Sequence, residues 1–163
     1  HQRNYLKNTK SSLRIDSNRT REDNKCHLFE YYEEFNMREK IADFKNAHKG
    51  TSYARNAQGK LVAQSNWESI SEIELYGAVY GTLTVEADIN EPDANSGECS
   101  WAGEGFSPDG TRTVGFQSGT WEKIGNHKWS LKMTGKDSKS GGVYTESEIE
   151  LETLIWSGTV YTD

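Results

Sequence analysis

Apolar and polar residues alternate with a period of two through most of the chain from Gly77 to Asp163. Each alternating run ends in a cluster of turn-forming residues, namely Asn90–Asp93, Pro108–Gly110, Gly125–Asn126 and Ser138–Gly142. Period-two alternation closed by such clusters is typical of consecutive antiparallel strands joined by short hairpins. This half of the chain therefore predicts a β-meander.

The residues before Gly77 extend the meander, but their pattern fits more than one type of secondary structure. Residues 51–57 and 61–76 form the two arms of an expected hairpin around a turn at Gln58-Gly59. Residues 26–37 are aromatic enough to favour a strand, whereas Ile41, Phe44 and Ala47 have helical spacing. A helix that caps the barrel and a pair of strands both fit residues 26–50. Residues 1–25 are polar and aperiodic, and predict a flexible arm, a short helix or a lid over a barrel mouth.

About eight strands, counted from Phe29 and mostly adjacent in sequence, predict an all-β fold. We expect an antiparallel up-and-down barrel of the calycin type over residues 26–163, because closure removes exposed sheet edges. A jelly roll or a sandwich would need longer crossover connections. A barrel of this size either fills its interior with side chains or encloses one small ligand.

The alternation also assigns inner and outer faces. Trp129, Leu131 and Met133 fall on one face of their strand, and Ser130 and Lys132 on the other. Rows of glutamates, as in residues 146–150, are interpreted as solvated outer faces, since carboxylates two apart on a strand diverge and make a poor metal site. The sequence contains no HxH, HxxxH or CxxC spacing, so we expect no metal.

Two strands have no cleanly apolar face. In residues 98–106 one face carries Cys99, Trp101 and two glycines, and in residues 111–121 one face combines threonines and glycines with Gln117 and Trp121. Small residues beside tryptophan and an isolated polar group are typical of a cavity wall. The alternative is that these glycines mark bulges and barrel corners.

The composition argues against two kinds of partner, nucleic acid and the membrane interior. The net charge of −6, with no alternation of basic and aromatic residues, argues against nucleic acid, and no apolar run is long enough for a membrane span. Cys26 and Cys99 leave one disulfide to consider, but two free thiols are favoured, and with them a cytoplasmic location over secretion. Association of copies through an outer face is a further expectation for a small barrel.

Ser118-Gly119-Thr120-Trp121-Glu122-Lys123 resembles the Gly-x-Trp segment of lipocalins and the GTW of fatty-acid-binding proteins, although here it lies about three quarters along the chain. The glycine-rich strand pattern over residues 53–161 is similar to the allene oxide cyclase-like barrels, which include dirigent proteins and cofactor-free natural-product cyclases. These resemblances imply a barrel that encloses a small hydrophobic molecule.

The first functional hypothesis is a cofactor-independent isomerase, cyclase or lyase acting on a small hydrophobic substrate inside the barrel. Glu104 is the candidate acid–base residue, because flanking glycines and Phe106 predict a desolvated carboxyl with a raised pKa. Residues expected to bind the substrate are Trp101, Gln117, Trp121, Tyr53, Trp67 and Phe106. Plain core packing is the alternative role for each aromatic residue.

The second hypothesis is a binding module for a hydrophobic ligand or a carbohydrate. A proton-transfer enzyme needs at least one perturbed ionisable group inside, whereas a carrier needs none. A carbohydrate binder should instead present tryptophan faces outside or at a rim. The third hypothesis is an interaction domain in which the N-terminal arm is the functional part.

Overall fold

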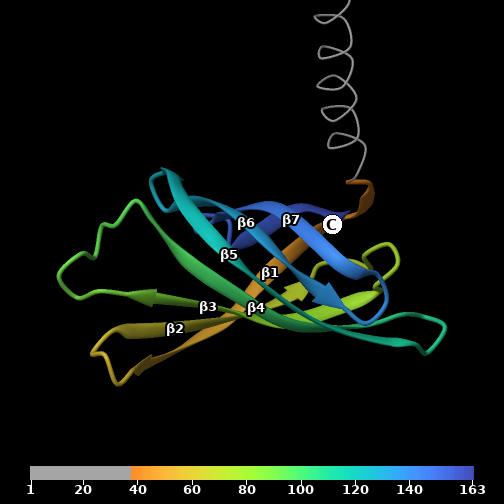
Figure 1. Ribbon diagram of the computed structural model, residues 1–163, viewed down its shortest axis with the longest axis horizontal. Helices are drawn as coiled ribbons and strands as arrows, with labels where there is room; N and C mark the ends of the chain where they lie inside the picture. Colours follow the sequence, from red (N-terminus) through yellow and green to blue (C-terminus); the bar gives the residue numbers. More distant parts are fainter. Residues whose placement is uncertain (1–37) are drawn as a thin grey trace, which may run out of the picture. The chain divides into compact units, whose positions relative to one another are not determined.

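A computed structural model describes residues 38–163, which form a closed antiparallel barrel (Figure 1). Its eight strands are β1 (Lys40–Arg55), β2 (Leu61–Ser69), β3 (Ala78–Ala87), β4 (Ser96–Phe106), β5 (Arg112–Gly125), β6 (Lys128–Asp137), β7 (Gly141–Glu150) and β8 (Ile155–Thr162). Each strand pairs with its neighbours in sequence, and β1 pairs with β8 to close the ring. The prediction of an all-β, eight-stranded up-and-down barrel is confirmed. This is the architecture of a lipocalin-like barrel.

β1 settles the part of the sequence that fitted both a helix and strands. Residues 40–50, with the helical spacing of Ile41, Phe44 and Ala47, lie in one strand that runs on to Arg55. Cross-strand pairing with β2 and β8 along its length outweighs local helical spacing. The expected return arm of the first hairpin ends at Ser69 rather than Tyr76. The predictions for residues 1–25 and for a strand at 26–37 lie outside the described residues.

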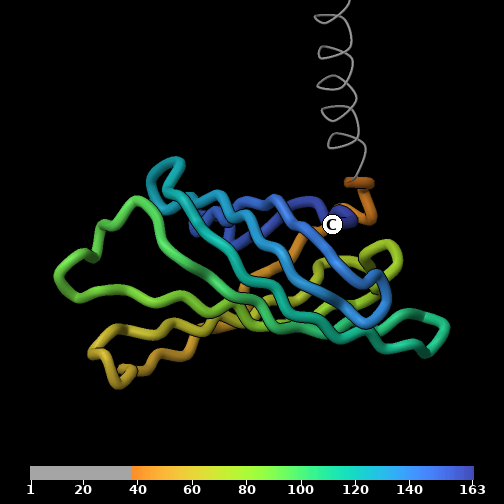
Figure 2. The backbone as a smooth tube through the Cα atoms, viewed as in Figure 1, coloured from red at the N-terminus to blue at the C-terminus, as the bar shows by residue number. Residues whose placement is uncertain are grey.

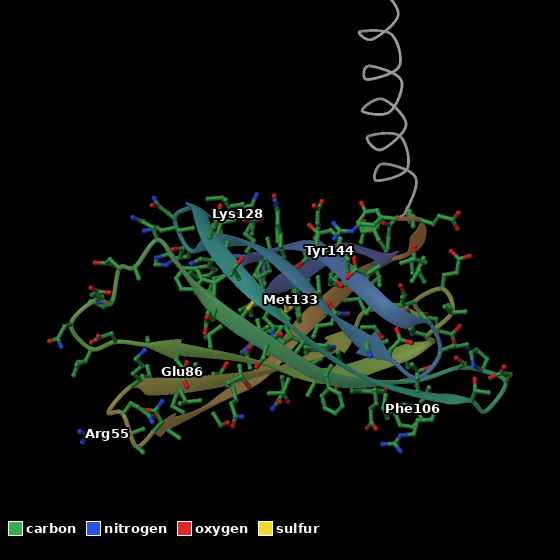
Figure 3. All side chains as sticks on the ribbon, viewed as in Figure 1. Arg55, Glu86, Phe106, Lys128, Met133 and Tyr144 are labelled. Atoms are coloured by element: carbon green, nitrogen blue, oxygen red, sulfur yellow. The ribbon has the colours of Figure 1, made fainter. Side chains whose placement is uncertain are left out.

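Inner and outer positions alternate as the sequence predicts. Leu131 and Met133 on β6 are each only 2% exposed, whereas Lys132 between them is exposed. Figure 3 shows Met133 within the barrel, while Glu86 and Lys128 lie at its surface. Among the described residues, no helix is long and apolar enough to cross a membrane.

The centre of the barrel is an aromatic layer around Trp156. This indole is 2% exposed and meets Phe44, Trp67 and Trp101 in edge-to-face contacts, with ring centroids 5.6, 5.6 and 5.0 Å away. Its Nε1–H donates a hydrogen bond to Ser147 Oγ at 2.8 Å. Edge-to-face packing of this kind adds about 0.5–1.5 kcal/mol per pair beyond area burial. Trp156 therefore joins β8 to β2 and β4, with which β8 forms no backbone pairs, and adds a side-chain contact to the pairing of β8 with β1.

Glycines make room for the indole of Trp101. A Cβ added at Gly81 or Gly103 would lie 2.3 or 2.6 Å from the indole, so the ring lies against bare backbone on β3 and β4. Elsewhere the inward glycines permit close approach of neighbouring strands, as at Gly119, whose Cβ would meet the Lys132 carbonyl oxygen. The pairings of β4 with β3 and β5 run in continuous register, so the glycines of β4 do not mark bulges there.

The two ends of the barrel are built differently, as the tube in Figure 2 shows. One end carries the β1–β2 hairpin and the connections β3–β4, β5–β6 and β7–β8. The other carries the β4–β5 and β6–β7 hairpins and residues 70–77, the connection between β2 and β3. We call residues 70–77 the cap, because Ile73 and Tyr76 are buried with Ala42 in a second apolar cluster.

Candidate functional site

A cavity lies inside the barrel between the aromatic layer and the cap. Its volume is about 100 Å³. Trp101, Met133 and Trp156 of the central cluster line it, and so do Ile73 and Tyr76 of the cap. An apolar cavity of about 150 Å³ admits benzene, so this space suits a molecule of at most one six-membered ring.

Two polar groups in the cavity wall have no hydrogen-bond partner among residues 38–163. They are Asn46 Oδ1 on β1 and Thr113 Oγ1 on β5, in side chains that are 3% and 4% exposed. Almost all buried polar atoms in proteins are paired, and an unpaired one costs about 1–3 kcal/mol. Unsatisfied groups at a cavity wall are therefore a feature that needs an explanation.

A third polar feature of the wall is already satisfied. Thr145 on β7 donates its hydroxyl hydrogen to Gln117 Oε1 on β5 at 2.7 Å. Both side chains line the cavity. Gly103, Gly105 and Gly115 form the wall of β4 and β5 beside Gln117, and they let Trp101, the Tyr76 backbone and Asp137 approach the strands closely.

The cap is fastened to the barrel by Tyr76. Its hydroxyl donates to Asp137 Oδ2 at 2.8 Å and lies 3.0 Å from Ser140 Oγ, so it joins the cap to the β6–β7 hairpin. Burial raises the pKa of the Tyr76 phenol well above its usual value, and the hydrogen bond to Asp137 adds to the rise. The phenol therefore stays protonated and able to donate throughout the neutral range.

The backbone of the cap is held from two sides. The Leu75 carbonyl oxygen accepts hydrogen bonds from Lys139 Nζ at 2.9 Å and from Ser107 Oγ at 3.2 Å. Gly77 has a φ of +74°, and a Cβ there would collide with the Phe106 carbonyl oxygen, so only glycine fits. Leu75 takes a φ of +73° without being glycine, which places local strain in the cap.

The residues proposed from sequence separate into inner and outer groups. Trp101 and Gln117 both line the cavity. Trp67 is buried in the central layer and donates from Nε1 to Ser65 Oγ at 2.8 Å, away from the cavity. Trp121 is partly buried beside Gly97, and its Nε1 has no partner in the described part of the chain.

Glu104 is not the desolvated carboxyl that the sequence suggested. Its Oε2 accepts hydrogen bonds from Arg112 Nε at 3.0 Å and Nη2 at 2.6 Å, and its side chain is 37% exposed. Glu104 pairs in register with Tyr80 and Val114, which are exposed on the outer surface. Glu104 is among the residues that border the cavity, but its carboxylate is directed to Arg112 at the surface. Its catalytic role has no support from this position.

Phe106 and Tyr53 also lie at the surface. Phe106 (Figure 3) is 44% exposed. Its ring packs edge-to-face against Tyr80. Tyr53 is 67% exposed near the β1–β2 hairpin, at the end of the barrel away from the cap. Neither residue lines the cavity.

Asn46, Thr113, Tyr76 and Trp156 were not identified from the sequence. Asn46 follows Ala42 and Phe44 at period two. If residues 40–55 are assigned to a strand, the sequence itself therefore shows a polar residue on an apolar strand face, which indicates a buried polar group. Thr113 shares a face with Gln117 in the sequence pattern. Tyr76 lies in a connection, where periodicity carries no information.

Other chemistry in the barrel is limited. Within residues 38–163 no group of three or more His, Cys, Asp or Glu side chains is placed to hold a metal ion. Cys99 is buried and has no disulfide partner within residues 38–163, and burial raises the pKa of its thiol to about 11. Cys26 lies outside the described residues, so the choice between a Cys26–Cys99 disulfide and two free thiols stays a prediction.

Comparison with known proteins identifies no relative: no family model, no curated protein and no solved structure matches the chain.

Proposed function

We propose that the barrel is a binding module that holds one small, mostly apolar molecule in the cavity beneath the cap. The observation that carries the proposal is the pair of buried, unpartnered oxygens, Asn46 Oδ1 and Thr113 Oγ1. They stand in a wall that also holds aromatic and aliphatic side chains, and the other buried polar pair of that wall, Gln117 and Thr145, is already satisfied. Concave, apolar sites with a few placed polar groups are the usual form of small-molecule sites.

The free-energy cost of the two oxygens supports this proposal. If each unpaired group costs about 1–3 kcal/mol, the pair costs about 2–6 kcal/mol, a sizeable part of the stability of a small domain. A ligand that pairs them recovers part of that cost and also fills the cavity. Its affinity would come from contact with Trp101 and Trp156, and its orientation from the polar groups.

The experiment is a titration of the full chain with phenol, followed by calorimetry and by tryptophan fluorescence. Binding should perturb the fluorescence, because Trp101 and Trp156 line the cavity. Val79→Phe adds bulk to the cavity wall and should abolish binding. Val114→Phe is the matched control, because Val114 is 40% exposed on the outer surface, and it should bind phenol normally. Equal binding by both variants would refute the cavity as the site.

An enzymatic function is the second candidate, and one observation favours it. Tyr76 and Asp137 both border the cavity and share a hydrogen bond, which joins a protonated phenol to a carboxylate. Such a pair could transfer a proton at a carbon next to a carbonyl group, the type of step that a cofactor-free isomerase or cyclase needs. The resemblance to allene oxide cyclase-like barrels points the same way.

Exchange of the α-hydrogens of cyclopentanone in heavy water tests this second candidate. The catalysed step removes a proton from the α-carbon and returns a deuteron to it, which proton NMR follows as loss of signal. Acceleration by the full chain that Tyr76→Phe abolishes would support proton transfer. A rate equal to that of buffer would leave the barrel as a binding module.

A further inference from the structure

The two unpartnered oxygens stand on opposite walls of the barrel. Asn46 is on β1 and Thr113 on β5, and these strands are four places apart in a closed ring of eight. Both side chains nevertheless border the same cavity of about 100 Å³. One hydroxyl group at one edge of a ligand would therefore pair with one of these oxygens and leave the other unpaired.

The hydrogen-bonding roles of the two groups differ. Asn46 Oδ1 is an amide oxygen and accepts only, so its partner must donate. Thr113 Oγ1 belongs to a hydroxyl and both donates and accepts. A ligand that satisfies both needs a donor at one end and a donor or an acceptor at the other.

The charged side chains at the cavity are ion-paired, exposed or already hydrogen-bonded. Glu104 is paired with Arg112, and Lys136 is exposed. Asp137 accepts hydrogen bonds from the Tyr76 hydroxyl and from the backbone N–H groups of Lys139 and Ser140. An anionic ligand would be desolvated beside the Asp137 carboxylate without a counter-charge, which is costly, and a cationic one would compete with the three donors whose hydrogen bonds Asp137 already accepts.

We infer that the ligand is a neutral molecule of about one six-membered ring with polar groups at opposite ends, at least one of them a hydrogen-bond donor. A para-dihydroxylated ring is the simplest example. This inference rests on the proposed binding function, and specifies the chemistry of the molecule that the same cavity takes.

A series of four probes tests the inference on the full chain: benzene, phenol, 1,2-benzenediol and 1,4-benzenediol, the diols kept under nitrogen. Dissociation constants are measured by calorimetry or NMR titration. We expect 1,4-benzenediol to bind about tenfold more tightly than phenol, because it pairs both oxygens rather than one. The 1,2-isomer should gain no comparable advantage, because its two hydroxyl groups lie at one edge.

Thr113→Val removes one unpaired oxygen with almost no change in shape. In this variant 1,4-benzenediol and phenol should bind equally well. Thr120→Val is the matched control on the exposed face of β5, and it should keep the preference for the 1,4-diol. If Thr113→Val fails to fold, the relative affinities of the natural chain for the 1,2- and 1,4-diols still test the inference.

The outcomes separate this inference from the binding proposal. Equal affinity for the two diols, or a preference that survives Thr113→Val, would overturn the inference while the cavity remains a binding site. Failure of all four probes to bind would instead refute the binding function itself.

Discussion

Replacing Tyr76 by phenylalanine should loosen the cap without disturbing the barrel. The substitution keeps the buried ring, which is 8% exposed, and removes only the hydroxyl that donates to Asp137 and contacts Ser140. A hydrogen bond to a charged acceptor is worth about 1.5–3 kcal/mol, and solvent near the exposed hairpin reduces this to about 1–2 kcal/mol. A loss of about 1.4 kcal/mol corresponds to a tenfold greater population of the open cap.

Amide hydrogen exchange measures that population directly. The N–H groups of Tyr76 and Gly77 donate to the Ile73 carbonyl oxygen within the cap, at 3.1 and 2.8 Å. Exchange at these two amides should become about tenfold faster in Tyr76→Phe, while amides of β6 and β7 change little. Ligand association should also accelerate if the cap is the entrance to the cavity.

Tyr144→Phe is the matched control. The Tyr144 hydroxyl (Figure 3) donates to Glu146 Oε1 at 2.6 Å within β7, so this variant loses the same type of bond without removing a contact to the cap. Cap exchange should stay at the level of the natural chain. Unchanged exchange in Tyr76→Phe, or an equal effect in both variants, would refute the reasoning.

Alkaline pH provides an independent check on the same bond. The folded-state pKa of Tyr76 lies above the ordinary value of 10.0, so the unfolded state loses this proton first. The stability that the phenol contributes is therefore complete below about pH 10 and declines as the pH rises further. Opening of the cap should become more frequent over that range in the natural chain and less so in Tyr76→Phe.

Three further predictions concern packing, the buried thiol and the surface ion pair. Gly103→Ala places a Cβ 2.6 Å from the Trp101 indole and should cost about 1–3 kcal/mol in urea unfolding; a smaller change would contradict the packing described. In a Cys26→Ser background, Cys99 should react with a thiol reagent at about pH 8 only as fast as the barrel unfolds, because burial raises its pKa to about 11; rapid labelling would contradict this. Glu104→Gln should change stability by at most about 1 kcal/mol and leave phenol binding intact, whereas loss of binding would restore an active role for Glu104.

The barrel could be predicted because the signals that specify it are local. Alternation through β6 and the turn clusters are written in adjacent residues, and burial of Leu131 and Met133 follows directly. β1 could not be assigned in the same way, because its strand state depends on pairing with β2 and β8, which is not visible in residues 40–55 alone.

The site was harder to predict because it depends on which face of a strand points inward. Trp101 and Gln117 were proposed as cavity residues and line the cavity. Glu104 also borders it, but its carboxylate is paired with Arg112 and partly exposed rather than desolvated. Glycines on the inner face gave no apolar signal, since they accommodate the Trp101 indole rather than fill space themselves. Asn46 faces Thr113 only because β1 and β5 lie across a closed ring, a relation that no local pattern contains.

A crystal structure of the full chain grown with 1,4-benzenediol tests the central claim most directly. We predict density for one ring beneath the cap, against Trp101 and Trp156, with its two hydroxyl groups towards Asn46 Oδ1 and Thr113 Oγ1. Density for water alone in the cavity, or a collapsed interior in which the two oxygens are paired with other side chains, would contradict the account.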